Sequence, residues 1–386
     1  MRPPTRTLTG TVVTARGELP DTTVTITGDT ITAVGAAAPG TETDLRLVPG
    51  FVDLHNHGGR RGSFPDGSAE ECLAAVHHHR GHGTTTLLAS LVSASPDHLL
   101  RQIPVLADLA GDGEIAGIHL EGPFINTGRC GAQDPAAIIP GDAGLFARLI
   151  AAGRGHIRSI TFAPETADVP ALLDLCAEYG IIASLGHTAA SHEETARVID
   201  AAVGKHVTVT ATHLFNAMPA LHHRNPGAAA ALLAAAARGD IHVELIADGV
   251  HLADGTVDMV LAAVGQKAVL VSDAMQAAGM PDGSYTLGSL DVTVRGGVAR
   301  LSSADGSPGA IAGGTSTLAE QVGRHLGRGV PLPTLVAAAS SAPAAVLGLG
   351  DRIGDIAPGH RADIVVLDSQ GGVQEIIRRG LTIERS

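Results

Sequence analysis

An α/β fold, a (β/α)8 barrel of the TIM type, is predicted for the central part of this chain, with a small β-sandwich domain built from both chain ends. Eight short apolar runs recur at fairly even intervals, and helix-forming stretches separate them. Strands that alternate with helices are typical of a parallel α/β fold, and eight such units indicate a closed barrel. We therefore expect residues 1–48 and 352–386 to form the β domain and 49–351 the barrel.

Both chain ends have short strand patterns with no helical period. Neither end is long enough for a core of its own, so we expect the two to combine into one unit with the barrel inserted between them. The expected strands of this unit are Leu8–Thr14, Thr22–Thr27, Thr30–Val34, Ile364–Leu367, Val373–Ile377 and a last short strand after Gly380.

The barrel is expected to alternate strands and helices along the chain. Its expected strands are Leu47–Leu54, Thr84–Ala89, Glu114–Leu120, Ile157–Ala163, Ile181–Leu185, Val207–Thr212, Ile241–Ala247 and Ala268–Ser272. Its expected helices are Ala69–Arg80, Pro96–Ala110, Asp142–Ala152, Val169–Tyr179, His192–Val203, Gly255–Val264, Thr317–Leu326 and Pro333–Leu347. A small hairpin is expected over Gly283–Leu301, after the eighth strand.

Composition narrows the class of protein. The hydrophobic fraction of 44% can build a large core, but with only 2% aromatic residues that core must consist of Ala, Val, Leu and Ile. A net charge of −13 argues against a nucleic acid or an anionic membrane surface as partner. We expect no signal peptide and no membrane span, and the odd set of Cys72, Cys130 and Cys176 fits a reducing cytoplasm.

Polar residues follow several of the expected strands, whose carboxyl ends converge on one mouth of the barrel. Glu121, His187 and His213 form a three-ligand set that leaves a fourth position for water, as in hydrolytic zinc sites. His55 and His57 alternate after the first strand, so both rings can face the barrel axis. Alternatively, this pair is a structural one that caps the barrel with hydrogen bonds. Each of the three other residues, taken alone, could likewise be a structural polar group whose hydrogen bonds are satisfied.

Further residues near these strand ends are candidates for catalysis and substrate binding. Asp273 ends the eighth strand and suits acid/base work beside an activated water, its alternative being a structural ligand or helix cap. The ring of His251 can hold a substrate group or polarise a carbonyl. Arg224 can clamp a phosphate with Asn216 and the backbone N–H of Ala217, although a lone loop arginine is often only solvated.

With these motifs assembled, the chain resembles the N-acetylglucosamine-6-phosphate deacetylases of the metal-dependent amidohydrolase superfamily, nearly from end to end. The motifs that carry this resemblance are Pro49-Gly-Phe-Val-Asp-Leu-His-Asn-His, Leu120-Glu-Gly-Pro-Phe, Leu185-Gly-His-Thr, Thr212-His-Leu-Phe-Asn-Ala-Met, Asp248-Gly-Val-His, Ser272-Asp-Ala-Met and Ile311-Ala-Gly. The stretch from Ile353 to Leu367 matches the superfamily's return strand.

The resemblance implies a role for each matching residue. Glu121, His187 and His213 are expected to bind the main divalent metal, with Asp273 as the catalytic acid/base. The intact pair of His55 and His57 offers a second metal site, so one or two ions per subunit are expected: zinc first, with iron, cobalt and manganese as alternatives. The expected substrate contacts are Ala132, Gln133, Asn216, Ala217, Arg224, His251, Ile311, Ala312 and Gly313.

One position departs from the family pattern. Gln133 stands where many relatives have a histidine that helps to hold the substrate and sometimes a metal. An amide can still donate a hydrogen bond to a hydroxyl but cannot become cationic. The reaction type is unaffected, while substrate affinity, substrate breadth and the second metal are left open, as is the effect of neighbouring Cys130.

The resemblance implies hydrolysis of the acetamide of N-acetylglucosamine 6-phosphate to glucosamine 6-phosphate and acetate, in amino-sugar catabolism and recycling towards cell-wall precursors. It further implies a homodimer that binds a small amino-sugar phosphate, in the cytoplasm that the cysteine content indicates. Two alternatives stay open: another amidohydrolase, such as a deaminase or cyclic amidase acting on an uncharged ring, and a non-catalytic barrel scaffold. Loss of activity when the 6-phosphate is removed from the substrate would distinguish the deacetylase from another amidohydrolase. A bound metal together with acetate release would distinguish it from a non-catalytic scaffold.

Overall fold

The computed structural model describes residues 3–41, 43–303 and 307–384. The chain divides into two compact units: Met1–Asp53 with His77–Thr86 and Thr317–Ser386, and Leu54–Val76 with Leu87–Ser316. The domain boundaries that the sequence predicts, at 48/49 and 351/352, remain a prediction.

The first unit contains a seven-stranded sheet built from both ends of the chain. Its strand order is β20-β19-β18-β4-β1-β2-β3. The strands are β1 (Thr5–Thr14), β2 (Gly17–Thr27), β3 (Thr30–Ala36), β4 (Arg46–Pro49), β18 (Ile364–Leu367), β19 (Val373–Arg378) and β20 (Leu381–Thr382). The three strands from β1 to β3 are antiparallel in sequence order, as expected for turns rich in Gly and Asp.

The two ends of the chain meet at one strand pair. β4 pairs antiparallel with β18, with Ile364 opposite Pro49 and Leu367 opposite Arg46. Val12 and Ile26 from the N-terminal strands share one buried core with Ile377 from the C-terminal strands. The prediction that both ends form a single β unit is therefore confirmed, because neither set of strands buries its apolar face without the other. The helices of this unit are α8 (Leu318–Gly327), α9 (Leu332–Val336) and α10 (Ala342–Val346).

The parallel barrel is confirmed as the second architectural element. Its strand order is β14-β13-β12-β11-β10-β9-β8-β5. The strands are β5 (Phe51–Asp53), β8 (Thr84–Leu91), β9 (Gly117–Glu121), β10 (Ile157–Phe162), β11 (Ile182–Leu185), β12 (Val209–Ala211), β13 (His242–Leu245) and β14 (Ala268–Leu270). Beyond the last strand the ring closes through backbone: Asp273 N–H donates to the His55 carbonyl at 2.9 Å, and His57 N–H to that of Ala274 at 2.7 Å.

The first expected strand, Leu47–Leu54, is wrong as one element, because the chain forms β4 and β5 with Gly50 between them. Gly50 N–H donates to the Asp363 carbonyl, whereas Phe51 N–H donates to that of Gly83, so the two halves pair with different neighbours. A Cβ on Gly50 would lie 2.2 Å from Oγ1 of Thr85, so only glycine fits between β4 and β5.

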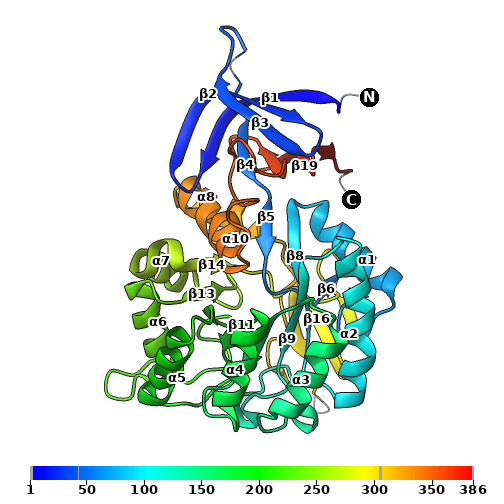
Figure 1. Ribbon diagram of the computed structural model, residues 1–386, viewed down its shortest axis with the longest axis vertical. Helices are drawn as coiled ribbons and strands as arrows, with labels where there is room; N and C mark the ends of the chain where they lie inside the picture. The colour runs from blue at the N-terminus through cyan, green and yellow to red at the C-terminus, as the bar shows by residue number, and fades with distance from the viewer. Residues whose placement is uncertain (1–2, 42, 304–306, 385–386) are drawn as a thin grey trace. The chain divides into compact units, whose positions relative to one another are not determined.

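Helices follow the barrel strands and lie outside them (Figure 1). They are α1 (Ala69–Arg80), α2 (Pro96–Gly111), α3 (Ala143–Ala152), α4 (Val169–Tyr179), α5 (His192–Gly204), α6 (Gly227–Arg238) and α7 (Asp254–Val264). The sequence prediction omits α6, because its run of alanines has no contrast between an apolar and a polar face. Among the described residues, none of the helices is both long and apolar enough to cross a membrane.

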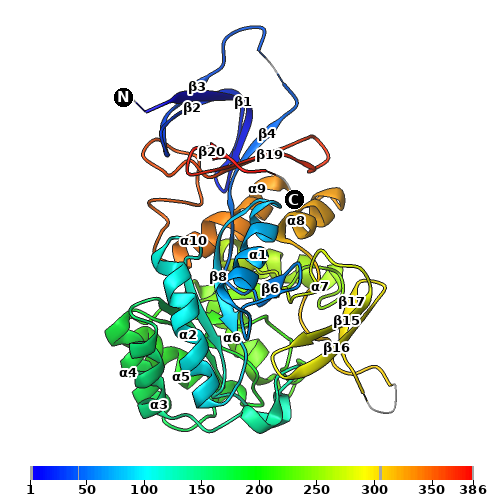
Figure 2. The same ribbon diagram turned by 90° about the vertical axis from the view of Figure 1, so that its right-hand side faces the viewer.

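The expected hairpin is a three-stranded antiparallel sheet, drawn in yellow in Figure 2. Its strands are β15 (Gly283–Leu287), β16 (Leu290–Arg295) and β17 (Val298–Leu301), and a short pair, β6 (Gly58–Gly59) with β7 (Gly62–Ser63), follows β5. Tyr285, Val292 and Ala299 pack this sheet against Met275 and Ala312. It thereby holds the chain that follows Asp273.

Candidate active site

The candidate site residues stand directly after barrel strands, where the backbone turns sharply. His187, His213 and Asp273 follow β11, β12 and β14, and all three have positive φ values, of 47°, 26° and 47°. Residues other than glycine rarely adopt this conformation, and it concentrates at functional sites. Gly186 allows the turn at His187, because a Cβ there would lie 2.6 Å from the Cβ of Thr212.

Glu121, His187 and His213 converge as the sequence predicts. Oε1 of Glu121 lies 3.0 Å from Nε2 of His187 and 2.9 Å from Nε2 of His213, and the two Nε2 atoms are 3.1 Å apart. All three side chains are buried. Nδ1 of His187 lies 2.9 Å from the carbonyl oxygen of Arg129, which can only accept, so Nδ1 donates this bond and Nε2 is the ring nitrogen directed at Glu121.

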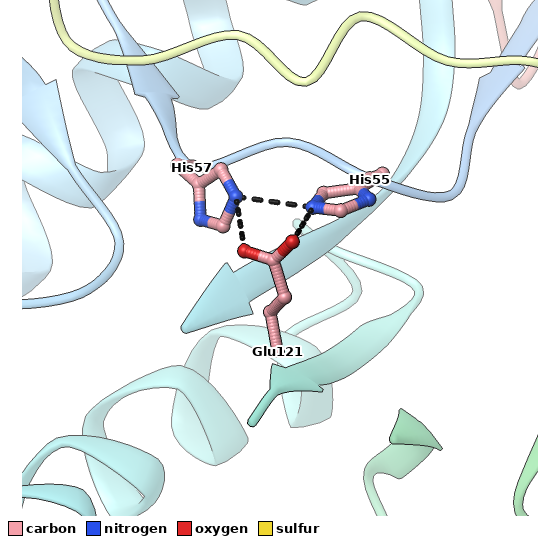
Figure 3. A group of neighbouring side chains, drawn as sticks. All are labelled: His55, His57 and Glu121. Carbon is pink, nitrogen blue, oxygen red and sulfur yellow. Dashed lines mark hydrogen bonds and ion pairs between the residues drawn. The ribbon is translucent and has the colours of Figure 1, made fainter. Parts of the chain in front are cut away.

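His55, His57 and Glu121 form a second group of donor atoms (Figure 3). The Nε2 atoms of the two histidines are 3.1 Å apart, and Glu121 reaches up from the end of β9 to lie between both rings. Nδ1 of His57 donates to the Ser90 carbonyl at 3.1 Å, and Nδ1 of His55 to Oε2 of Glu244 at 3.3 Å. Glu121 is shared by the two groups.

This donor set fits divalent metal ions. In each group two imidazole Nε2 atoms and a carboxylate oxygen lie within 4.8 Å of one another in a buried space, where a divalent cation can accept a lone pair from each. Nδ1 of His213 is also buried with no hydrogen-bond partner among the described residues, so this ring is held chiefly from its Nε2 side. Histidine and carboxylate donors with outer hydrogen bonds of this kind are typical of catalytic metal sites.

The histidines and carboxylates around the second donor group shift one another's pKa values. Burial would lower the pKa of His55, but the carboxylates of Asp273 and Glu121 outweigh it and raise this pKa well above its usual value. Burial would raise the pKa of the Glu121 carboxyl, but the charge of His55 and the hydrogen bond from His187 lower it well below its usual range. The site therefore keeps its carboxylates ionised, as metal ligands must be.

Asp273 lies beside the second donor group. Its Oδ1 is 3.2 Å from Nε2 of His57 and 3.3 Å from Nε2 of His55. Burial would raise the pKa of Asp273, but the charge of His55 and the hydrogen bond from His57 lower it. The ionised carboxylate borders the cavity, so it is placed to accept a proton.

A cavity of about 230 Å³ opens in front of these residues. The structure brings seven of the nine expected substrate contacts to its wall: Ala132, Gln133, Asn216, Ala217, His251, Ile311 and Gly313. The Ala312 side chain is instead fully buried in the core of the small sheet. Arg224 lies on an exposed loop, where its guanidinium donates to Nε2 of His223 at 2.8 Å, and does not line the cavity.

His251 is held in the cavity wall by Asp248. Nδ1 of the ring donates to Oδ2 of Asp248 at 2.8 Å, and the other carboxylate oxygen accepts the backbone N–H of both Val250 and His251 at 2.8 Å. Burial would raise the pKa of Asp248, but the hydrogen bond and charge of His251 lower it. With Nδ1 engaged, Nε2 is the ring nitrogen left to meet a ligand.

A layer of polar residues that the sequence motifs do not indicate lies beneath the donors. Glu244, His119, Ser90 and Thr161 are all buried in the barrel interior. Glu244 contacts His55, and His119 stacks edge-on against the same ring with centroids 4.5 Å apart. A signal for Glu244 was present, because it is the one carboxylate within the apolar run Ile241–Ala247.

Family comparison agrees with this geometry. The model of the amidohydrolase family matches residues 46–382, which include every donor described above. This chain belongs to the amidohydrolase family. The family and the donor set together support a divalent metal in the amidohydrolase.

The relatives of this amidohydrolase include deacetylases of sugar phosphates. It is 35% identical to the N-acetylglucosamine-6-phosphate deacetylase of Bacillus subtilis over 87% of this chain and 84% of the relative. It is 32% identical to the N-acetylgalactosamine-6-phosphate deacetylase of Escherichia coli O157:H7 over 88% of each protein. A solved Mycobacterium smegmatis structure, a mutant N-acetyl-D-glucosamine-6-phosphate deacetylase in complex with N-acetyl-D-glucosamine-6-phosphate, is 40% identical. Its TM-score is 0.91 over 98% of this chain and 99% of that chain. The family resemblance predicted from the motifs is confirmed.

Proposed function

We propose that this amidohydrolase removes the N-acetyl group of N-acetylglucosamine 6-phosphate and releases glucosamine 6-phosphate and acetate. The observation that carries the proposal is the shared carboxylate of Glu121, whose Oε1 lies within 3.0 Å of two histidine Nε2 atoms at the wall of a cavity. The deacetylases named above, similar over most of their length, support the substrate class.

The proposed ligands of the main metal are Glu121, His187 and His213, and those of a second metal His55 and His57 with Glu121. When bound, a divalent metal supplies Lewis acidity, which polarises the acetamide carbonyl and makes a water molecule more acidic. We propose zinc, because two histidines and a carboxylate with an open position are typical of hydrolytic zinc. Iron, cobalt and manganese use the same donors, so metal analysis of the purified protein decides among them.

Asp273 carries the proton in the proposed reaction. Its ionised carboxylate accepts a proton from the attacking water, whose oxygen bonds to the carbonyl carbon of the acetamide. The same carboxyl then delivers this proton to the amine nitrogen as the C–N bond breaks. The Asp273 carboxyl is ionised when substrate arrives, as the first step requires.

Other residues of the chain bind and orient the sugar phosphate. His251 offers Nε2 to the acetyl carbonyl or a sugar hydroxyl, because Asp248 holds its Nδ1. Arg224, Asn216 and the backbone N–H of Ala217 anchor the phosphate, which requires the exposed Arg224 side chain to leave His223 and turn towards the ligand. The remaining proposed contacts are Ala132, Gln133, Ile311, Ala312 and Gly313.

We further propose that the protein is a cytoplasmic homodimer with a β domain of residues 1–48 and 352–386 and a barrel of 49–351. Light scattering of the purified protein tests the dimer.

N-acetylgalactosamine 6-phosphate is a second candidate substrate, favoured by the 32% identity to a deacetylase of that sugar. The two sugars differ only in the configuration of one hydroxyl, so the same metal and acid/base groups serve both.

Acetate release from four sugars, with metal analysis of the same sample, tests the proposal: N-acetylglucosamine and N-acetylgalactosamine, each with and without the 6-phosphate. We expect the highest kcat/KM with N-acetylglucosamine 6-phosphate and a large loss without the phosphate. A higher kcat/KM with N-acetylgalactosamine 6-phosphate would make that sugar phosphate the preferred substrate instead. Metal-bound protein that releases no acetate from any of the four would contradict deacetylation and leave the deaminase, cyclic amidase and scaffold alternatives.

A further inference from the structure

Glu244 is a buried carboxylate that the proposed reaction does not use. It lies in β13 with 2% of its surface exposed. Oε2 accepts from Nδ1–H of His55 at 3.3 Å and from the backbone N–H of His213 at 3.2 Å. A buried carboxylate is costly unless it is paired, so its retention at this point calls for a role.

One oxygen atom of Glu244 thus contacts both donor groups. Its bond to His55 makes Nδ1 the donor to Glu244 and directs Nε2 at Nε2 of His57, 3.1 Å away, where a metal can be bound. Its bond to the His213 backbone supports a residue with a φ of 26°, outside the regions that most residues prefer. The orientation of a ligand from each donor group therefore depends on the same side chain.

A chain of hydrogen bonds ties Glu244 to the rest of the barrel interior. Oε1 of Glu244 accepts from the Thr210 hydroxyl at 3.4 Å. From there, links of 2.6–2.9 Å pass through Thr210, Ser184, Thr212, Thr161, His119 and Ser90. The Ser90 hydroxyl accepts the backbone N–H of Asn56 at 2.9 Å, beside His55 and His57. Such a network restricts the rotamer of the Glu244 side chain, because moving it breaks several buried bonds.

We propose that Glu244 is a positioning residue for the metal centre, acting through the imidazole of His55 and the backbone of His213. It touches neither substrate nor the reacting atoms. Carboxylates that accept the outer N–H of a ligating histidine fix its tautomer and raise its basicity, and their loss typically weakens metal binding 10- to 100-fold. The proposal rests on the proposed function only in that both require a bound metal.

The test is metal affinity of the whole protein, measured by zinc competition with a chromophoric chelator. Glu244→Gln has the same shape but no charge, and we expect it to bind zinc 10- to 100-fold more weakly than wild type. Glu193→Gln is the matched control, because it makes the same change in a side chain that is 80% exposed on helix α5, and it should bind zinc as wild type does. Circular dichroism checks that each variant is folded.

Glu244→Asp gives a second measurement that keeps the charge. Its carboxylate is one methylene shorter and withdraws from Nδ1 of His55, so zinc affinity should again fall. Wild-type affinity in a folded Glu244→Gln or Glu244→Asp protein would overturn the proposal. Weakened zinc binding in these variants, together with no acetate release by the wild type, would instead contradict the deacetylase function and leave the role of Glu244 intact.

Discussion

The side-chain amide of Gln133 donates a hydrogen bond to Oε2 of Glu121, the carboxylate that both donor groups share. The carbonyl oxygen of the same amide accepts the backbone N–H of Ser93 at 2.6 Å, so the buried Gln133 is fixed at both ends. Gln133 therefore orients the carboxylate of Glu121 as well as lining the cavity. An amide at this position can therefore hold the shared carboxylate and the Ser93 backbone at the same time.

Gln133→Ala should destabilise the metal-free protein. The change leaves the Ser93 N–H without this acceptor and removes one donor from the buried Glu121 carboxylate, at an expected cost of about 1–3 kcal/mol in the free energy of unfolding. Urea denaturation in the presence of a chelator measures this difference. Gln266→Ala, at an exposed position, is the control, and equal stability of the two variants would contradict the role of Gln133.

Asp273→Asn should lower kcat by about 100- to 10,000-fold, because an amide cannot accept the proton of the attacking water. The amide keeps the shape of the carboxylate, so the variant should retain its metal. Initial rates of acetate release with metal analysis of the same sample test both points. Asp258→Asn, on an exposed face of α7, is the control. Near-normal turnover would remove Asp273 from the mechanism.

Removal of the metal should abolish activity and destabilise the fold. A ligand at 100 times its dissociation constant stabilises the native state by about 2.7 kcal/mol, and dialysis against a chelator removes that contribution. Thermal unfolding before dialysis, after it and after re-addition of zinc measures the effect. Full activity in protein shown to be metal-free would contradict metal-dependent hydrolysis.

Arg224→Ala should raise KM for the phosphorylated substrate about 10- to 100-fold, because a charge-assisted hydrogen bond contributes about 1.5–3 kcal/mol. Activity on the sugar without phosphate should not change, since that ligand has nothing for Arg224 to bind. Arg238→Ala is the control, as Arg238 pairs with Asp240 on the surface. An equal loss on both substrates would assign Arg224 to folding rather than to phosphate binding.

His242 should make stability depend on pH. Burial, with a smaller effect from the charge of Lys267, lowers the pKa of His242 from 6.5 to about 4. Because the unfolded chain binds this proton more tightly, the stabilisation is present above about pH 6.5 and is lost as the pH falls towards 4. At pH 5 the expected loss is about 2 kcal/mol.

His242→Gln lacks this proton-linked contribution. The difference in free energy of unfolding between wild type and His242→Gln should therefore change by about 2 kcal/mol between pH 7 and pH 5. Urea denaturation at the two pH values measures it, with His192→Gln as the partly exposed control. A difference that does not vary with pH would show that His242 titrates normally in the folded protein.

Much of the fold and of the candidate site is predictable from local sequence. The polar endings of the apolar runs identify Glu121, His187, His213 and Asp273, because the ends of parallel strands meet at one mouth whatever the details of packing. The break at Gly50 and helix α6 are not predictable in this way. The break at Gly50 depends on which strands its two halves pair with, and the sequence does not show this. Helix α6 is a run of alanines with no apolar periodicity to reveal it.

By itself, the sequence determined most of the strands and helices, the residues that gather at the site and the family, since each depends on residue type and spacing along the chain. Only the tertiary structure decided that Glu121 is shared between two donor groups, that Gln133 and Glu244 hold the donors, and that Arg224 lies outside the cavity wall. The reason is physical: these relationships join side chains from different strands and loops. The distances between such side chains depend on how the barrel closes, and spacing along the chain carries no information about that.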